Sequence, residues 1–182
     1  MDYRIAKPPI SKPLGEMSKQ ELIEYRSWFE ASLPPRLGLL KELVRSSRKY
    51  RNWVPDFSPS SIGELSEWSQ ETLELEGPRG EESPTEISIL MDIAMYMGES
   101  LVRASPSIKW EHNIRCPRND VDFGAMVING PSGLKFDPFR IIYVASLILR
   151  DGRLGSDWLS KTFELRFSLL IDGWDGKLGI RP

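Results

Sequence analysis

The 182-residue sequence contains only one cysteine and one histidine. One cysteine cannot form an intramolecular disulfide, and the two side chains together cannot supply the four nitrogen and sulfur ligands of a structural zinc site. The second histidine that the HExxH motif of zinc hydrolases requires is also missing. We therefore expect the protein to work without a metal or another cofactor.

Neither an excess of positive charge nor a long apolar run is present. The chain has 24 basic and 26 acidic side chains, so nucleic acid, which attracts proteins with a positive surplus, is not an expected partner. The longest apolar stretch, residues 141–149, is much shorter than the roughly 20 residues of a membrane span. The N-terminal residues lack the basic start and apolar run of a signal peptide. The expected location is the cytoplasm, with no membrane partner.

Proline is concentrated near the N-terminus, where three prolines disfavour a helix. We expect residues 1–17 to form an extended arm on the surface. The composition of the chain, 40% hydrophobic and 27% charged, is typical of a folded protein, and its length corresponds to one domain. The prediction is a single domain over residues 18–172, followed by an irregular tail over residues 173–182.

Hydrophobic residues recur at helical spacing in several segments, and capping signals mark where these segments begin. Ser18 and Glu21 are spaced as a capping box, as are Ser83 and Glu86. The Pro34–Pro35 pair interrupts the first long pattern, so we expect one helix to end there and another to begin. The predicted helices span residues 18–33, 34–47, 58–75, 83–104, 137–150 and 156–172.

Alternation of apolar and polar residues replaces the helical spacing after residue 106. Residues 107–114 and 123–128 are expected to form an antiparallel pair, and residues 133–136 a third short strand. The run 138–150 is rich in Ile and Val and would also suit a strand, but its length and its Asp-Pro start favour a helix. The expected fold class is α+β, with five or six helices packed around an antiparallel sheet of two to three strands.

The helix expected over residues 83–104 carries a narrow polar stripe on an otherwise apolar surface. Asp92, Tyr96 and Glu99 lie on this stripe, with the phenol between the two carboxylates. These side chains could serve acid–base catalysis if burial raised the pKa of one carboxylate. The alternative, which we favour, is a structural network in which Glu99 pairs with Arg103 and Asp92 accepts hydrogen bonds, because buried polar groups are normally satisfied in this way.

Other groups of reactive residues give weaker signals. His112 and Cys116 would need a third orienting group to act as a nucleophilic pair, and none is indicated. Asp120 and Asp122 could bind a cation, although the segment equally suits a turn. The segment Asn129–Gly133 resembles a phosphate loop only superficially, since the Gly-Lys-Ser/Thr ending is missing, and we expect a turn.

The near-neutral charge is the sum of two opposed blocks. Residues 36–51 contain six basic side chains against one acidic, and residues 64–86 contain eight acidic against one basic. The two blocks could neutralise each other if their helices lie side by side, or both could be solvated surfaces. Alternatively, one block forms an electrostatic docking surface for a protein. The residues expected to bind such a partner are Glu64, Glu67, Glu71 and Glu74.

A family resemblance supports a protein partner. The segment Asp92-Ile93-Ala94-Met95-Tyr96-Met97-Gly98-Glu99, followed by Trp110, a hairpin and a proline-initiated helix, is similar to a pattern in a group of small bacterial cytoplasmic α+β proteins. Some proteins of that group resemble immunity proteins encoded beside secreted polymorphic toxins. The resemblance covers residues 87–150 and brings no catalytic residues. In it, Gly98 permits close approach of the hairpin, and Trp110 packs over the gap.

Two functions from different classes follow from the sequence. The first is a non-catalytic, cytoplasmic protein-binding protein of the immunity type, which neutralises a cognate toxin by occluding it. The second is a small, hydrolase-like enzyme that uses Asp92, Tyr96 and Glu99. The missing catalytic constellation, the acidic block and the resemblance favour the first.

Overall fold

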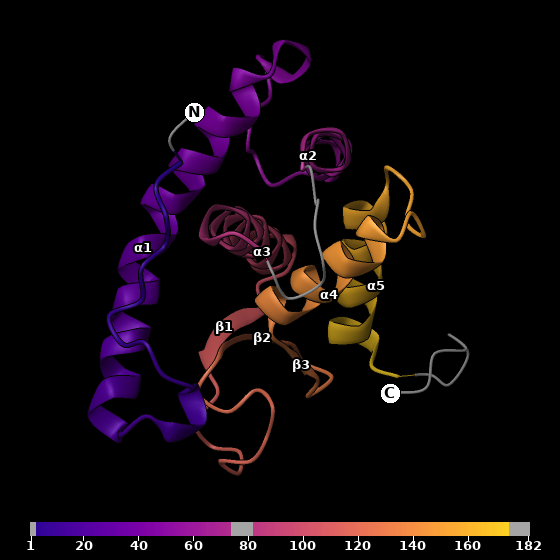
Figure 1. The fold of residues 1–182 in the computed structure, drawn as a ribbon. Helices are drawn as coiled ribbons and strands as arrows, with labels where there is room; N and C mark the ends of the chain where they lie inside the picture. Colours follow the sequence, from indigo (N-terminus) through magenta and orange to yellow (C-terminus); the bar gives the residue numbers. More distant parts are fainter. Residues whose placement is uncertain (1–2, 74–81, 175–182) are drawn as a thin grey trace.

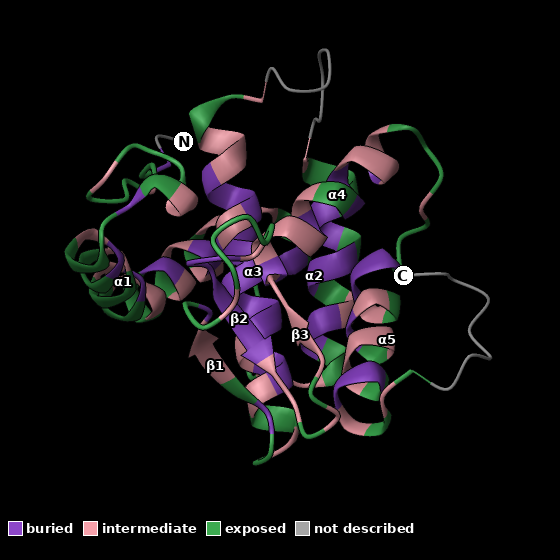
Figure 2. Ribbon diagram, turned by 90° about the horizontal axis from the view of Figure 1, so that it is seen from below, coloured by how far each residue is buried: buried purple, intermediate pink, exposed green. Residues whose placement is uncertain are grey.

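Helix α3 (Pro84–Ala104) lies at the centre of the fold. In the computed structural model, which describes residues 3–73 and 82–174, α3 packs against three other helices and two strands (Figure 1). Apolar residues surround α3 on nearly every side, and 12 of its 21 residues are buried (Figure 2). Its neighbours are α1 (Lys19–Ser46), α4 (Pro138–Arg150), α5 (Trp158–Asp172), β1 (Lys109–His112) and β2 (Met126–Asn129).

The sheet has three antiparallel strands in the order β1-β2-β3, with β3 at Lys135–Phe136. In the register, Trp110 of β1 faces Ile128 of β2, which faces Phe136 of β3 on its other side. β2 begins later than expected because Gly124 has a positive φ of 78° and the residues before it form hydrogen-bonded turns. The predicted α+β class with a small antiparallel sheet is confirmed.

The first two predicted helices are one continuous helix, so the described chain has five α-helices instead of six. Pro34 and Pro35 lie inside α1, where each lacks the amide that a helix interior uses. Side chains on both sides of the pair hold the two halves in place: Phe29 packs on Met95 and Met126, while Leu40 joins the main core. The break at the proline pair was wrong because tertiary packing outweighs the local penalty.

The N-terminal arm is largely extended but is not a surface appendage. Tyr3 and Met17, near its two ends, are only 7% and 2% exposed. Met17 packs with Leu22 and Phe123 in a small cluster beside the start of α1, and a 3₁₀ turn over Leu14–Glu16 precedes it. The expected surface location therefore does not hold for the ends of the arm, which belong to the core.

The remaining helices begin at the capping residues that the sequence indicates. Ser58 caps α2 (Pro59–Thr72), Asp137 caps α4, and Ser83 forms the predicted capping box of α3 with Glu86. α5 begins after Asp157, as expected. Most of the loop predicted after residue 75 and of the C-terminal tail lies outside the described residues. No helix among the described residues is both long and apolar enough to cross a bilayer.

Gly98 lets β1 approach α3 closely. A Cβ atom built on Gly98 would lie 2.3 Å from Cζ2 and 2.4 Å from Cη2 of Trp110, well inside the van der Waals distance. The indole packs edge-on against Phe29 of α1, with ring centroids 5.0 Å apart. The predicted packing of Trp110 over Gly98 is confirmed, and this contact joins the sheet to both α3 and α1.

We expect Gly98→Ala to lower the free energy of unfolding by about 1–3 kcal/mol, because the new methyl group overlaps the Trp110 ring. Gly38→Ala is the matched control, since Gly38 lies exposed in α1 with no atom within 4 Å of the new Cβ. Removing a helical glycine there should raise the stability by about 0.5–1 kcal/mol. Urea denaturation measures both, and equal effects of the two substitutions would contradict the proposed contact.

Candidate functional site

Asp92 is fully buried and bound by two side chains from other elements. The guanidinium of Arg36, on α1, donates from Nε to Oδ1 at 2.6 Å and from Nη2 to Oδ2 at 2.7 Å. The hydroxyl of Tyr3 donates a short hydrogen bond to Oδ2. Arg36 also donates to the backbone carbonyls of Arg4 and Ser88. These bonds tie α3, α1 and the N-terminal arm together.

The electrostatics of this cluster indicate a structural role. Burial raises the pKa of Asp92 to about 6, while the bonds from Arg36 and Tyr3 act in the opposite direction. Burial and the neighbouring carboxylate raise the pKa of Tyr3. Both oxygens of Asp92 are occupied by protein donors, so neither is available to take a proton from a substrate.

Tyr96 binds a different partner set. Its hydroxyl accepts a hydrogen bond from the Phe57 amide at 3.0 Å and lies 2.6 Å from Oγ of Ser61 at the start of α2. Its ring stacks on Phe57, with centroids 4.9 Å apart. Phe57 has a positive φ of 65°, which a bulky L-residue rarely adopts. Tyr96 therefore stabilises a strained backbone position that leads into α2.

Glu99 forms a third network. One oxygen accepts a hydrogen bond from Nε1 of Trp110 at 2.8 Å, and the other lies 3.5 Å from Nε of Arg103. The expected Glu99–Arg103 pair is therefore present. Asp92, Tyr96 and Glu99 share one helix, but each side chain binds different neighbours, and the structure does not bring them together around one reacting point.

The remaining reactive residues are also held in structural contacts. Nε2 of His112 lies 3.1 Å from the Gly124 carbonyl, and burial lowers the pKa of the imidazole. Cys116 Sγ instead donates to the Asn113 carbonyl at 3.5 Å, so it does not pair with His112. Asp120 accepts from the Asp122 amide in a turn. Among the described residues, no three His, Cys, Asp or Glu side chains are grouped as metal ligands.

Three of the acidic residues expected to bind a partner lie exposed along α2, and Glu74 falls outside the described residues. Glu64, Glu67 and Glu71 follow one another at helical spacing on one side of α2. Nζ of Lys49 lies 3.4 Å from Glu67 and 2.6 Å from Glu71. Glu64 has no ion pair with any described residue. One lysine thus opposes three carboxylates, and we call these three the α2 acidic face.

The basic block does not cancel this charge. Its first residue, Arg36, is buried against Asp92, and Arg45 donates to the Trp53 carbonyl at 2.7 Å. Arg48 and Arg51 are exposed and form no ion pair with described residues. Within the described parts of the two blocks, only Lys49 forms ion pairs between them, and exposed side chains of both signs remain on the surface.

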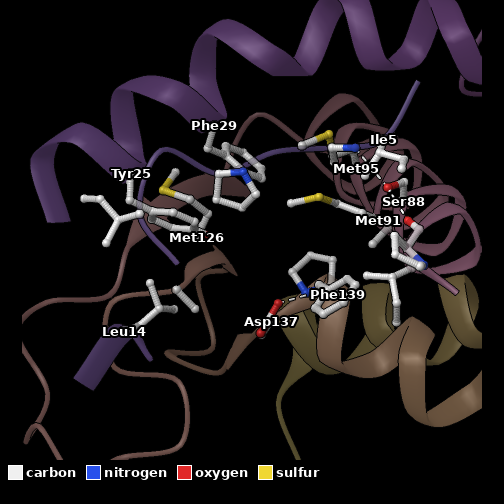
Figure 3. A pocket seen from close by; sticks show the side chains of 18 of the residues that line it. Ile5, Leu14, Tyr25, Phe29, Ser88, Met91, Met95, Met126, Asp137 and Phe139 are labelled. Carbon is white, nitrogen blue, oxygen red and sulfur yellow. Dashed lines mark hydrogen bonds between the residues drawn. The ribbon is translucent and has the colours of Figure 1, made fainter. Parts of the chain in front are cut away.

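A cavity of about 500 Å³ lies beneath the N-terminal arm. Its walls come from the arm, α1, α3, β2 and the start of α4, and most of the lining is apolar. Figure 3 shows Met91, Met126 and Phe139 around the central space, with Asp137 and Ser88 as polar groups at its edge. No local sequence pattern indicates this cavity, because its walls come from segments that are distant in the chain.

Asp137 is a carboxyl of the cavity lining whose environment perturbs its pKa. Its Oδ1 accepts a hydrogen bond from the Phe139 amide at 2.9 Å, which caps α4. Burial, as the main cause, raises the pKa of Asp137 to about 6, and the charge of Asp122 acts in the same direction. Tyr25 faces the same cavity, and its pKa is raised to about 12 by burial and by the charge of Asp137.

A second cavity of about 630 Å³ lies between α1 and the outer strand β1. Glu99 and His112 both line it, together with charged residues of both signs from α1 and β1. Both oxygens of Glu99 and Nε2 of His112 already have protein partners. This cavity therefore brings Glu99 and His112 to one surface, but the two side chains do not form a catalytic pair there.

Comparisons with known proteins give this chain no relative: no family model, no curated protein and no solved structure matches it.

We expect Arg36→Met to lower the free energy of unfolding by about 3–5 kcal/mol, because the substitution leaves a buried carboxylate without its cation. The double substitution Arg36→Met with Asp92→Leu removes both charges and should recover more than half of this loss. Guanidinium denaturation of the three proteins measures the effect. A double variant as unstable as the single one would contradict this account of the ion pair.

Asp137→Asn should make stability less dependent on pH. Asparagine keeps the capping acceptor, but it does not titrate. The raised pKa means that the folded wild-type protein holds the Asp137 proton more tightly than the unfolded chain, so this stabilisation is complete below about pH 4 and is lost as the pH rises through about 6. Relative to the variant, the wild type should lose about 1–3 kcal/mol between pH 4 and pH 7. If the unfolding free energies of the wild type and the variant changed with pH in parallel, the raised pKa of Asp137 would be refuted.

Proposed function

We propose that this protein is a non-catalytic, cytoplasmic protein-binding protein of the immunity type, which neutralises a cognate bacterial toxin by occluding it. The observation that carries this proposal is the α2 acidic face: three exposed carboxylates on one side of a helix, opposed by one lysine. A toxin is proposed as the class of partner because the sequence pattern of residues 87–150 led us to expect an immunity-type protein.

The α2 acidic face suits recognition of a basic protein surface. Exposed charges of one sign raise the rate of encounter with an oppositely charged partner and disfavour acidic ones. α2 is packed firmly against the core. Trp68 and Leu65 on its inner side are fully buried, and Nε1 of Trp158 on α5 donates a hydrogen bond to Oγ of Ser69 at 3.0 Å. A rigid helix presents its carboxylates in a fixed pattern, which supports specific binding over general attraction.

The site chemistry favours binding over catalysis. Asp92 and Tyr96 are fully buried and occupied by protein partners, and Glu99 is bound by Trp110. A hydrolase-like mechanism would require at least one of these groups to face a substrate. The catalytic alternative would need at least one of these networks to open toward a substrate, whereas binding at α2 uses carboxylates that are already exposed.

The test begins with capture of a partner on the immobilised protein from a lysate of the source cells, followed by purification of that partner. Association is then measured by stopped-flow fluorescence at low and high salt. The triple variant Glu64→Lys, Glu67→Lys, Glu71→Lys should associate about 10–100-fold more slowly at low salt, because it repels the basic partner. Co-expression of the wild-type protein should also relieve growth inhibition by the partner.

The matched control is a second triple reversal, Glu24→Lys, Glu42→Lys, Glu164→Lys, at exposed sites on α1 and α5. It changes the net charge by the same amount and should slow association by less than about threefold, since dispersed charges contribute weakly to steering. Equal rates for the wild type and the α2 variant would refute the docking face. A partner that does not inhibit growth would refute the immunity role.

A further inference from the structure

The cavity beneath the N-terminal arm has the size and lining of a small-molecule site. Its volume of about 500 Å³ falls in the range typical of ligand pockets. Met91 and Met95 of α3 and Met126 of β2 supply flexible thioether walls, which adapt to apolar ligands of different shape. Phe29 and Phe139 add aromatic surface on opposite sides (Figure 3). The lining is therefore suited to an aliphatic or aromatic body.

The charged groups of the cavity select the head group of such a ligand. Lys12 is neutralised by Glu21, with Nζ and Oε2 2.8 Å apart, and Glu82 is paired with Arg150 at 3.4 Å. Asp137 has no ion pair with any described residue, and its ionised form is stabilised by the backbone amides of Arg140 and Phe139 and, more weakly, by the charge of Arg140. One carboxylate at the edge of an apolar space is thus the charge that a ligand can complement.

We propose that this cavity binds an amphipathic amine, with its apolar body between the methionines and its protonated amino group on the Asp137 carboxylate. A cation replaces the water that an ionised carboxylate would otherwise need, and a charge-assisted hydrogen bond fixes its orientation. The Tyr25 phenol, which also lines the cavity, is close enough to interact with Asp137 and has no hydrogen bond to a described residue. It is available as a second contact for the amino group.

The arm forms one wall of this site and is anchored next to it. The Ala6 amide donates to Oγ of Ser88 at 2.9 Å, and the Ser88 hydroxyl donates to the Pro84 carbonyl. Ile5, Pro8 and Ile10 of the arm line the cavity from above α1 and α3. Apolar arm residues thus cover the ligand body, while the carboxylate lies on the α4 side.

The test uses three chain-matched probes, decylamine, decanol and decanoate, with the isolated full-length protein. Calorimetry should give saturable binding of decylamine, at least tenfold weaker binding of decanol, and no binding of decanoate. Asp137→Asn, which keeps the helix cap, should weaken decylamine binding by about 10–100-fold and change decanol binding by less than twofold. Glu24→Gln is the control for loss of a carboxylate elsewhere and should leave decylamine affinity unchanged.

Methionine methyl NMR locates the probe independently of affinity. Decylamine should shift the signals of Met91, Met95 and Met126, which line the cavity, and leave that of Met97, buried elsewhere in the core, in place. Equal affinity for decylamine and decanoate would overturn the charge assignment. Saturable binding that leaves the signals of Met91, Met95 and Met126 unshifted, or no binding of any probe, would overturn the site. None of these outcomes depends on a protein partner at α2.

Discussion

The ion pair between Arg36 and Asp92 determines how the rest of the molecule is arranged. A helix that is apolar on nearly every side can occupy the centre of the fold, but the carboxylate it carries must then have a cationic partner. Arg36 provides that partner from α1 and so fixes the position of the long helix against α3. Tyr3 completes the cluster and brings the N-terminal arm to the same place. The arm in turn forms a wall of the apolar cavity.

The same residue types serve opposite purposes in different parts of the chain. Two carboxylates on α3 stabilise the fold: Asp92 pairs with Arg36, and Glu99 accepts a hydrogen bond from Trp110. Carboxylates on α2 face solvent, and Lys49 alone of the described basic residues pairs with Glu67 and Glu71. Burial therefore determines whether a carboxylate stabilises the fold or is exposed for binding a partner. Neither the residue type nor the helical spacing distinguishes these two roles. The proposed protein-binding face and the proposed amine site are both made of the charges that the fold leaves available.

Features that depend on local sequence were predicted well. The capping boxes at Ser18 and Ser83 need residues only three positions apart, and the contact of Gly98 with Trp110 joins adjacent elements. Features that depend on distant residues were not. Arg36 looks like the other members of a basic block, and its partner is 56 positions away. Pro34 and Pro35 indicated a helix break because their local cost is visible in the sequence, whereas the packing that outweighs it is not.

The anchoring of the arm has a consequence for the order in which the protein is made. The Tyr3 hydroxyl bonds to a carboxylate 89 residues later in the chain, and Ala6 bonds to Ser88. These two bonds of the arm cannot form until α3 has been synthesised, and closing so long a loop is slow compared with forming a helix. Until then, the prolines of the arm disfavour the formation of a helix or a strand within it.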